Sequence, residues 1–424
     1  MHRKVFLSIL GTGKYELTSY YFDDKSNGYK TRFIQEATIK HFCNNWDEND
    51  HIYFFLTNKA RTQNWNHPAE NGYDGLSEVI GKLNLKAKVD TKDLPDGNNE
   101  KELWQIFDII YGVLQENDDL YIDITHAFRS LPMLLTVLLT YAKVLKQVTV
   151  RSITYGNYEA RDENNLSPVI DLTALSSLQD WSLAANNFVS FGNADLLVEL
   201  TNNEIKPILK ETKGKDTTAS LLREVGNNIQ IFVKNILTVR GQSIYKGEQI
   251  DKIRKNIDEA KQANTQLPQL NPLLNQIDKK ISHFKATESV DNFLAATEWC
   301  IRHGLYQQAY SILLEGVVSY ICRAVNLSIT DITNRELISS ACYILQNETP
   351  ENQWDAKCQN NRETVHNILQ FLSDKKNLVK AIRTLSDSRN DFMHAGFREN
   401  PSNSKKLIEN IHKYYEAIRQ ELKL

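Results

Sequence analysis

The chain has 424 residues, of which 41% are hydrophobic and 24% charged, and its net charge is −3. These values are typical of a folded globular protein with more than one domain, and they exclude a broadly basic nucleic-acid coat. The five cysteines form no Cys-x-x-Cys pair, so we expect reduced thiols and no metal site. The longest apolar run, around residues 131–144, is too short to span a bilayer, and the N-terminus resembles a strand more than a signal peptide. We therefore expect a cytoplasmic protein that does not contact membranes.

The first third of the chain alternates between two hydrophobic patterns. Short apolar runs predict strands, and apolar residues at helical spacing predict the helices between them. In chain order we expect strands at 5–10, 51–56, 86–89, 120–124 and 148–154, and helices at 31–44, 73–83, 100–114 and 130–145. This alternation predicts a Rossmann-like α/β domain with a mostly parallel sheet. Residues 155–171 look like a hairpin or excursion, with 169–172 as a possible extra strand.

Strand patterns fade after residue 171, and helical segments interrupted by Gly and Pro follow. The best candidate for a linker is Leu267–Pro272. We therefore predict three regions: an α/β domain at 1–175, an all-α middle region at 176–286 and an all-α C-terminal domain at 287–424.

Polar residues follow several of the predicted strands. In α/β sheets, ligands bind where the carboxyl ends of strands meet the N-termini of helices. Hydroxyl, imidazole and guanidinium groups, together with N–H groups in turns, suit phosphates and purine edges. The candidate ligand-binding residues are Gly11, Thr12, Gly13, Lys14, Thr57, Thr125, His126, Arg129, Ser130 and Tyr155.

A structural interpretation of these residues stays open. Gly11–Gly13 would then be a plain tight turn, Asp123 and Thr125 would cap the next helix, Arg129 would form an ion pair, and His126 would be structural. An ordinary nucleotide-dependent enzyme is disfavoured, because Glu16 occupies the third glycine position of the dinucleotide fingerprint and no Walker Gly-Lys-Ser/Thr occurs.

A second candidate site follows an amphipathic helix near the C-terminus. Asn390 and His394 are four residues apart and share a helix face, and Gly396 is placed to end the helix. Metal-free RNA cleavage needs a histidine to move a proton and an arginine to stabilise charge on phosphorus. Arg389, Asn390 and His394 supply these groups. The alternative is a chance Arg-x-x-x-x-His in a chain with ten histidines.

Taken together, these motifs resemble a known family over the whole chain. The matching segments are Leu10–Gly13, Tyr53–Thr57, Asp123–Pro132, Tyr155–Arg161, Trp299–Gly316 and Arg389–His394. The chain resembles the CRISPR-associated CARF–HEPN ribonucleases that accompany type III interference complexes. It departs from the family's motif at Ala127, where a glycine is usual.

The resemblance implies a homodimer with a CARF sensor at 1–175 and a HEPN ribonuclease domain at 287–424. A cyclic oligoadenylate, expected to be cyclic tetra-adenylate, would be the allosteric activator and would bind across the twofold axis. Single-stranded RNA would be cleaved at a composite site without metal or other cofactor, and no stable association with the interference complex is expected. By resemblance, Gly11, Thr12, Gly13, Thr125, His126 and Arg129 contact the activator, and Arg389, Asn390 and His394 form the nuclease site. A nucleotide-sensing regulator that cleaves nothing is the open alternative.

Overall fold

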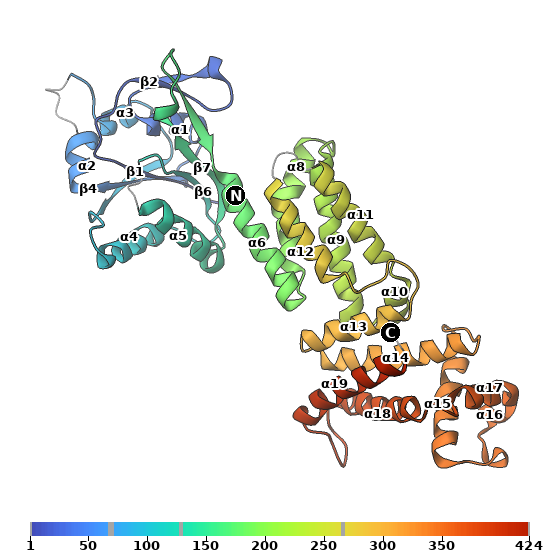
Figure 1. Ribbon diagram of the computed structural model, residues 1–424. Helices are drawn as coiled ribbons and strands as arrows, with labels where there is room; N and C mark the ends of the chain where they lie inside the picture. Colours follow the sequence, from blue (N-terminus) through green and yellow to red (C-terminus); the bar gives the residue numbers. More distant parts are fainter. Residues whose placement is uncertain (1, 67–71, 127–129, 264–267, 423–424) are drawn as a thin grey trace. The chain divides into compact units, whose positions relative to one another are not determined.

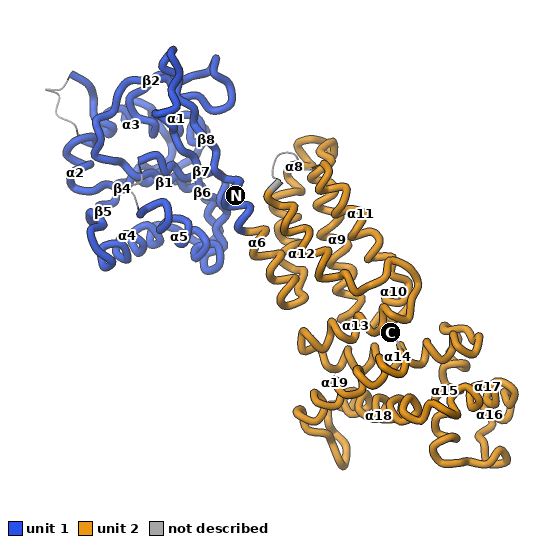
Figure 2. Tube along the Cα trace, in the orientation of Figure 1, with its two compact units in different colours: residues 1–179 blue, residues 180–424 orange. Residues whose placement is uncertain are grey.

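The computed structural model describes residues 2–66, 72–126, 130–263 and 268–422. The chain divides into two compact units, residues 1–179 and 180–424 (Figure 1; Figure 2). The first unit is an α/β domain and the second is built from helices, so the predicted order of an α/β domain followed by helical regions is confirmed. Apart from residues 176–179, the two predicted helical regions lie in the second unit, and residue 175 falls inside helix α6 (Thr173–Phe191).

The first unit contains an eight-stranded sheet with the order β3-β2-β8-β7-β6-β1-β4-β5. Its central part, β7-β6-β1-β4-β5, is entirely parallel. Beyond β7, strand β8 is antiparallel to β7 and parallel to β2, and β3 closes that edge as an antiparallel partner of β2. The strands are β1 (Lys4–Leu10), β2 (Thr18–Tyr21), β3 (Tyr29–Thr31), β4 (His51–Thr57), β5 (Lys88–Leu94), β6 (Asp119–Asp123), β7 (Thr149–Gly156) and β8 (Leu166–Asp171).

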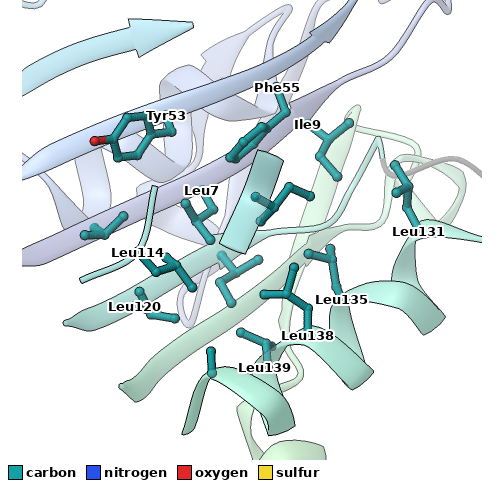
Figure 3. Packing of buried hydrophobic residues seen from close by; sticks show 14 of the residues in the cluster. Leu7, Ile9, Tyr53, Phe55, Leu114, Leu120, Leu131, Leu135, Leu138 and Leu139 are labelled. Atoms are coloured by element: carbon teal, nitrogen blue, oxygen red, sulfur yellow. The ribbon is translucent and has the colours of Figure 1, made fainter. Parts of the chain in front are cut away.

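Helices cover both faces of the sheet. Neighbouring residues of β1 point to opposite sides, so each face has apolar side chains that a helix buries. Leu7 and Ile9 pack with α4 and α5, whereas Phe6 and Leu10 belong to a separate cluster with α1 and α3. Figure 3 shows the first cluster, in which Leu135 of α5 lies opposite the strand residues. The helices of this unit are α1 (Ile34–Phe42), α2 (Asn58–Ala60), α3 (Leu76–Gly81), α4 (Glu100–Gly112), α5 (Leu131–Lys146) and the first part of α6, with short turns η1 (Lys25–Asn27), η2 (Arg61–Trp65) and η4 (Tyr158–Ala160).

The predicted and observed strands differ mainly at the edges of the sheet. The predicted third strand, 86–89, is β5, which begins two residues later and extends to Leu94. The possible extra strand at 169–172 is the end of β8, which begins at Leu166. Strands β2 and β3 were not predicted. These four strands lie outside the apolar centre of the sheet. Each forms because its backbone pairs with a neighbouring strand, and it needs no continuous apolar run.

The second unit contains helices joined by loops, and no strand among its described residues. Its elements are the second part of α6, α7 (Asp195–Leu200), η5 (Thr201–Ile205), α8 (Lys206–Glu211), α9 (Thr217–Leu237), α10 (Gly241–Lys246), α11 (Glu248–Ala263), η6 (Pro268–Leu270), α12 (Asn271–Lys280), α13 (Asp291–Arg302), α14 (Tyr306–Ala324), α15 (Ile332–Asn347), η7 (Glu351–Gln353), α16 (Ala356–Asn360), α17 (Arg362–Leu372), α18 (Lys376–Met393) and α19 (Ser404–Glu421). Among the helices that the structure describes, none is both long and apolar enough to cross a lipid bilayer.

Candidate functional site

The first candidate site lies where the strand order reverses. The chain runs from β1 outwards to β4 and β5 on one side, and to β6 and β7 on the other. In open α/β sheets, such a switch point leaves a crevice beyond the carboxyl ends of the two central strands. Residues 11–13 directly follow β1, and residues 124–126 directly follow β6, its parallel neighbour, so the structure brings these two predicted segments to the same edge of the sheet.

Asp123 ties the ends of three strands together. Its carboxylate accepts hydrogen bonds from Ser8 Oγ at 2.9 Å, Thr125 N at 3.0 Å and Thr125 Oγ1 at 2.5 Å. The Thr125 hydroxyl in turn accepts from Gly156 N at 2.8 Å, which links β6 to β7. Asp123 is completely buried, and burial raises the pKa of its carboxyl above the usual value, against the three hydrogen bonds that lower it. Asp123 and Thr125 thus hold strands together and do not cap α5, which begins after Ser130.

Asn64 fixes the glycine turn after β1. Its side-chain amide donates to the carbonyl oxygens of Gly11 and Gly13, each at 2.9 Å, and the residue is almost fully buried in η2. A Cβ atom on Gly11 would lie 2.8 Å from the Tyr15 hydroxyl, so only glycine fits there without displacing that side chain. The turn is thus held in one conformation, with Thr12 and Lys14 exposed beside it.

His126 packs against the same turn. Its ring lies 4.3 Å, centroid to centroid, from the ring of Tyr15. His126 Nε2 is buried and has no hydrogen-bond partner in the described part of the chain. Burial lowers the pKa of His126 to about 4, so the imidazole is neutral at pH 7. A neutral ring nitrogen without a partner is suited to a hydrogen bond with a ligand.

The remaining predicted ligand residues lie around this centre. Thr57 ends β4 and its hydroxyl accepts from Ala60 N at 3.2 Å, so it caps α2. Tyr155 pairs with β8 one residue before the end of β7. Ser130 precedes α5 and makes no side-chain cap. Arg129 and the atypical Ala127 lie outside the described residues.

Sequence reasoning missed three residues near the first site. Asn64 and Tyr15 belong to no recognisable motif, and only the fold places them against the glycine turn. Arg32 donates a hydrogen bond to the Tyr15 carbonyl oxygen and lies 3.9 Å from the ring centroid of Tyr73. Arg32 thus places a positive charge beside the turn, and the sequence did not indicate this charge.

The second candidate site lies at the end of α18. The helix ends at Met393, and His394 is its C-cap, with the His394 N–H donating to the Asn390 carbonyl at 3.0 Å. Ala395 and Gly396 then take left-handed backbone conformations, so the helix ends one residue before the position that the glycine predicted. Asn390 and His394 are both exposed.

The loop after His394 is fastened back onto α18. Arg398 donates to Asp387 Oδ1 at 2.8 Å, and Ser402 N donates to Asp391 Oδ2 at 2.9 Å. These contacts keep His394 at an open, fixed helix end, where its imidazole is accessible to a substrate.

Arg389 faces a different environment from His394. Its guanidinium lies 3.6 Å from Glu315 Oε1 on α14 and donates to Asn390 Oδ1 at 3.3 Å, whereas its Nε is buried without a hydrogen-bond partner among the described residues. Arg389 also lines a pocket of about 620 Å³ in the helical unit. The pocket is lined by Val239, Gly241, Gln242, Tyr245, Phe293, Ser311, Ile312, Glu315, Ser319, Ile329, Thr330, Arg335, Arg389 and Met393.

Potential metal ligands are dispersed through the described ranges. Within residues 2–66, 72–126, 130–263 and 268–422, no three His, Cys, Asp or Glu side chains are grouped so that they could hold a metal ion. All five cysteines are buried and free of disulfides.

Two comparisons relate the chain to known proteins. Residues 177–289 match the family described as "CRISPR-associated protein MJ1674, second domain". The chain is also 25% identical over 274 residues to the CRISPR-associated protein MJ1674 of Methanocaldococcus jannaschii, a match that covers 63% of this chain and 40% of that relative. The chain is thus similar to the CRISPR-associated protein MJ1674 over part of its length, and it spans less than half of that relative.

The matched segment takes part in the second site. It contains α9, α10 and the turn between them, and Val239 of this turn and Gly241 at the start of α10 contribute to the pocket wall. The MJ1674-like segment therefore lies directly against the pocket that Arg389 lines.

Proposed function

We propose that this CRISPR-associated chain is a ligand-gated endoribonuclease. A cyclic oligoadenylate, most simply cyclic tetra-adenylate, binds as a CARF ligand at the crevice between β1 and β6. Binding activates Arg389, Asn390 and His394, which cleave single-stranded RNA as a HEPN site without metal. The observation that carries the proposal is the end of α18, where an exposed histidine follows an arginine whose guanidinium is only partly hydrogen-bonded.

These groups match the chemistry of 2′-OH attack on the adjacent phosphodiester. His394 would move a proton, and the Arg389 guanidinium would stabilise the charge that builds on the phosphate oxygens. Asn390, whose side-chain oxygen accepts from Arg389, would orient the guanidinium. Each step uses side chains of this chain and the RNA itself.

The first site has features suited to an anionic nucleotide. The glycine turn is fixed by Asn64, the His126 ring nitrogen is unpartnered, and Arg32 and Lys14 place positive charge nearby. Turn N–H groups and cations of this kind bind phosphates, and the imidazole suits a purine edge.

Exposed apolar side chains support a homodimer. On α5, Met133 is 77% and Val144 74% exposed, with Val137 between them on the same helix. Beside His394, Met393 is 65% and Phe397 91% exposed. Large exposed apolar side chains that cluster commonly mark interfaces. A partner at the second cluster would complete a composite nuclease site, as the family resemblance implies.

Activation requires that the ligand bind the cleaving state more tightly than the idle state. A shift from about 1% to 99% active molecules needs roughly 10⁴-fold tighter binding to the active state. The ligand thus acts through the difference between its two affinities.

The test is cleavage of a single-stranded RNA by the full chain in EDTA, with cyclic tetra-adenylate, cyclic hexa-adenylate or neither. We expect cleavage only with an activator, and none by His394→Ala. Ligand binding without cleavage at any ring size would favour the nucleotide-sensing regulator. Cleavage that needs a divalent metal would refute the HEPN mechanism.

A further inference from the structure

The pocket beside Arg389 contains an unequal pair of arginines. Its lining includes three charged residues, Glu315, Arg335 and Arg389, so one carboxylate faces two guanidinium groups. The other lining residues are uncharged. How the carboxylate is shared decides how much positive charge the pocket offers to a ligand.

Arg335 is almost fully hydrogen-bonded by the protein. Its NH1 donates to Ser319 Oγ at 3.0 Å and to the Ile329 carbonyl at 2.8 Å. Its NH2 donates to the Glu315 carbonyl at 3.1 Å and to Glu315 Oε2. Four of the five N–H donors of an arginine are thus occupied, which fixes both Arg335 and the Glu315 carboxylate.

Arg389 is much less satisfied. It lies 3.6 Å from the other Glu315 oxygen, beyond hydrogen-bond distance, and its hydrogen bond to Asn390, the one it makes among the described residues, is long at 3.3 Å. Its buried Nε has no partner among the described residues. Because Arg335 forms the hydrogen-bonded ion pair with Glu315 and Arg389 only a looser one at 3.6 Å, the charge of Arg389 is only partly neutralised.

We propose that this pocket binds the RNA nucleotide next to the cleaved phosphate, and that Arg335 is the positioning residue that leaves the Arg389 guanidinium free for that phosphate. The proposal rests on the proposed function for the identity of the ligand. Arg335 binds Glu315 Oε2, the carboxylate oxygen that is not the one nearest Arg389. Without it, the unpaired carboxylate turns to Arg389 and cancels the charge that the phosphate needs.

The pocket has the size and lining for such a ligand. Its volume of about 620 Å³ is in the range of small-ligand sites. Apolar side chains such as Ile312 and Met393 line one part, and the Gln242 amide and the hydroxyls of Ser311 and Thr330 offer hydrogen bonds to base and ribose. In its wall, the β-branched Val239 has a φ of 54°, a strained backbone conformation of the kind that gathers at ligand sites.

The experiment uses the full chain with cyclic tetra-adenylate and a fluorescent single-stranded 2′-deoxy oligonucleotide, which lacks the attacking hydroxyl. Fluorescence anisotropy gives its Kd across a series of salt concentrations. Arg335→Gln should weaken binding about tenfold and lower the slope of log affinity against log salt by about 0.7, the loss of one phosphate contact. Arg335→Gln combined with Glu315→Gln should restore both the affinity and the slope, because no carboxylate remains to capture Arg389.

Two further variants make the result specific. Arg335→Lys keeps a positive charge beside Glu315 and should recover most of the lost affinity. Arg362→Gln on α17 removes an arginine that is likewise paired with a glutamate, Glu351 at 3.6 Å, but lies outside the pocket, and it should bind as the unaltered protein does. Circular dichroism checks that each variant is folded.

The outcomes separate this proposal from the proposed function. If the double variant binds as weakly as Arg335→Gln, the positioning role is refuted. If the unaltered protein does not bind the oligonucleotide either with or without cyclic tetra-adenylate, the pocket assignment is refuted. If binding follows the expected order but RNA is never cleaved, the pocket assignment stands and the nuclease activity is refuted.

Discussion

Replacing Asp123 by alanine should destabilise the α/β unit by about 3 kcal/mol. The variant leaves three buried or partly buried donors without their acceptor, namely the Ser8 hydroxyl and the Thr125 N–H and hydroxyl. Hydrogen bonds to a charged group contribute about 1.5–3 kcal/mol each, and relief from the cost of burying the carboxylate offsets part of their loss. For a unit of 179 residues, 3 kcal/mol corresponds to a fall in Tm of about 6–12 °C.

Asp123→Asn is the matched control. The asparagine oxygen still accepts from the Thr125 N–H, and its NH₂ group donates to the Ser8 hydroxyl oxygen, so we expect a loss below about 1 kcal/mol. Hydrogen exchange measured by mass spectrometry compares peptides from β1 and β6 with peptides from α18 in the same molecules. Faster exchange in β1 and β6 for Asp123→Ala alone is the expected result. Equal stability of the alanine and asparagine variants would refute the claim that the hydrogen bonds of Asp123 hold the strands together.

Three further predictions concern the two sites. The His126 pKa of about 4 lies below the unfolded value near 6.5, so the free energy of unfolding should fall by about 3 kcal/mol as the pH is lowered from 6.5 to 4. Urea unfolding of the α/β unit at a series of pH values should show this fall in the unaltered protein but not in His126→Phe. An unchanged pH dependence in the variant would contradict the burial argument. Asn64→Leu removes both donors to the glycine turn and should raise the activator concentration for half-maximal cleavage about tenfold, with no shift counting against the crevice as the activator site. His394→Ala should abolish cleavage while calorimetry still detects activator binding, because the two sites belong to different units; loss of both would show that the residues were assigned to the wrong sites.

The centre of the α/β unit could be predicted because its strands are continuous apolar runs. Strands such as β1 and β4 have six consecutive buried residues, which matches a parallel sheet covered on both faces. The edge strands carry no such pattern. In β5 the sequence Lys-Val-Asp-Thr-Lys-Asp-Leu is mostly polar, and pairing with β4 is what makes it a strand.

Local chemistry also predicted where α18 ends. A glycine shortly after His394 favours a left-handed residue, and this preference depends only on neighbouring residues. The motif positions Arg389, Asn390 and His394 were likewise visible in the sequence, as were Gly11–Gly13 and His126.

The partners of those residues were decided by the tertiary structure alone. Asn64 reaches Gly11 from 53 residues away, and Arg335 reaches Glu315 from 20 residues away. Such contacts depend on which elements the fold brings together, and a single sequence carries no periodic pattern for them. The sequence by itself determined the apolar strand centres, the helical half and the residues able to do chemistry. Only the tertiary structure decided which of these are held by neighbours, like Asp123, and which keep free donors, like Arg389, because hydrogen-bond satisfaction is a property of the packed chain.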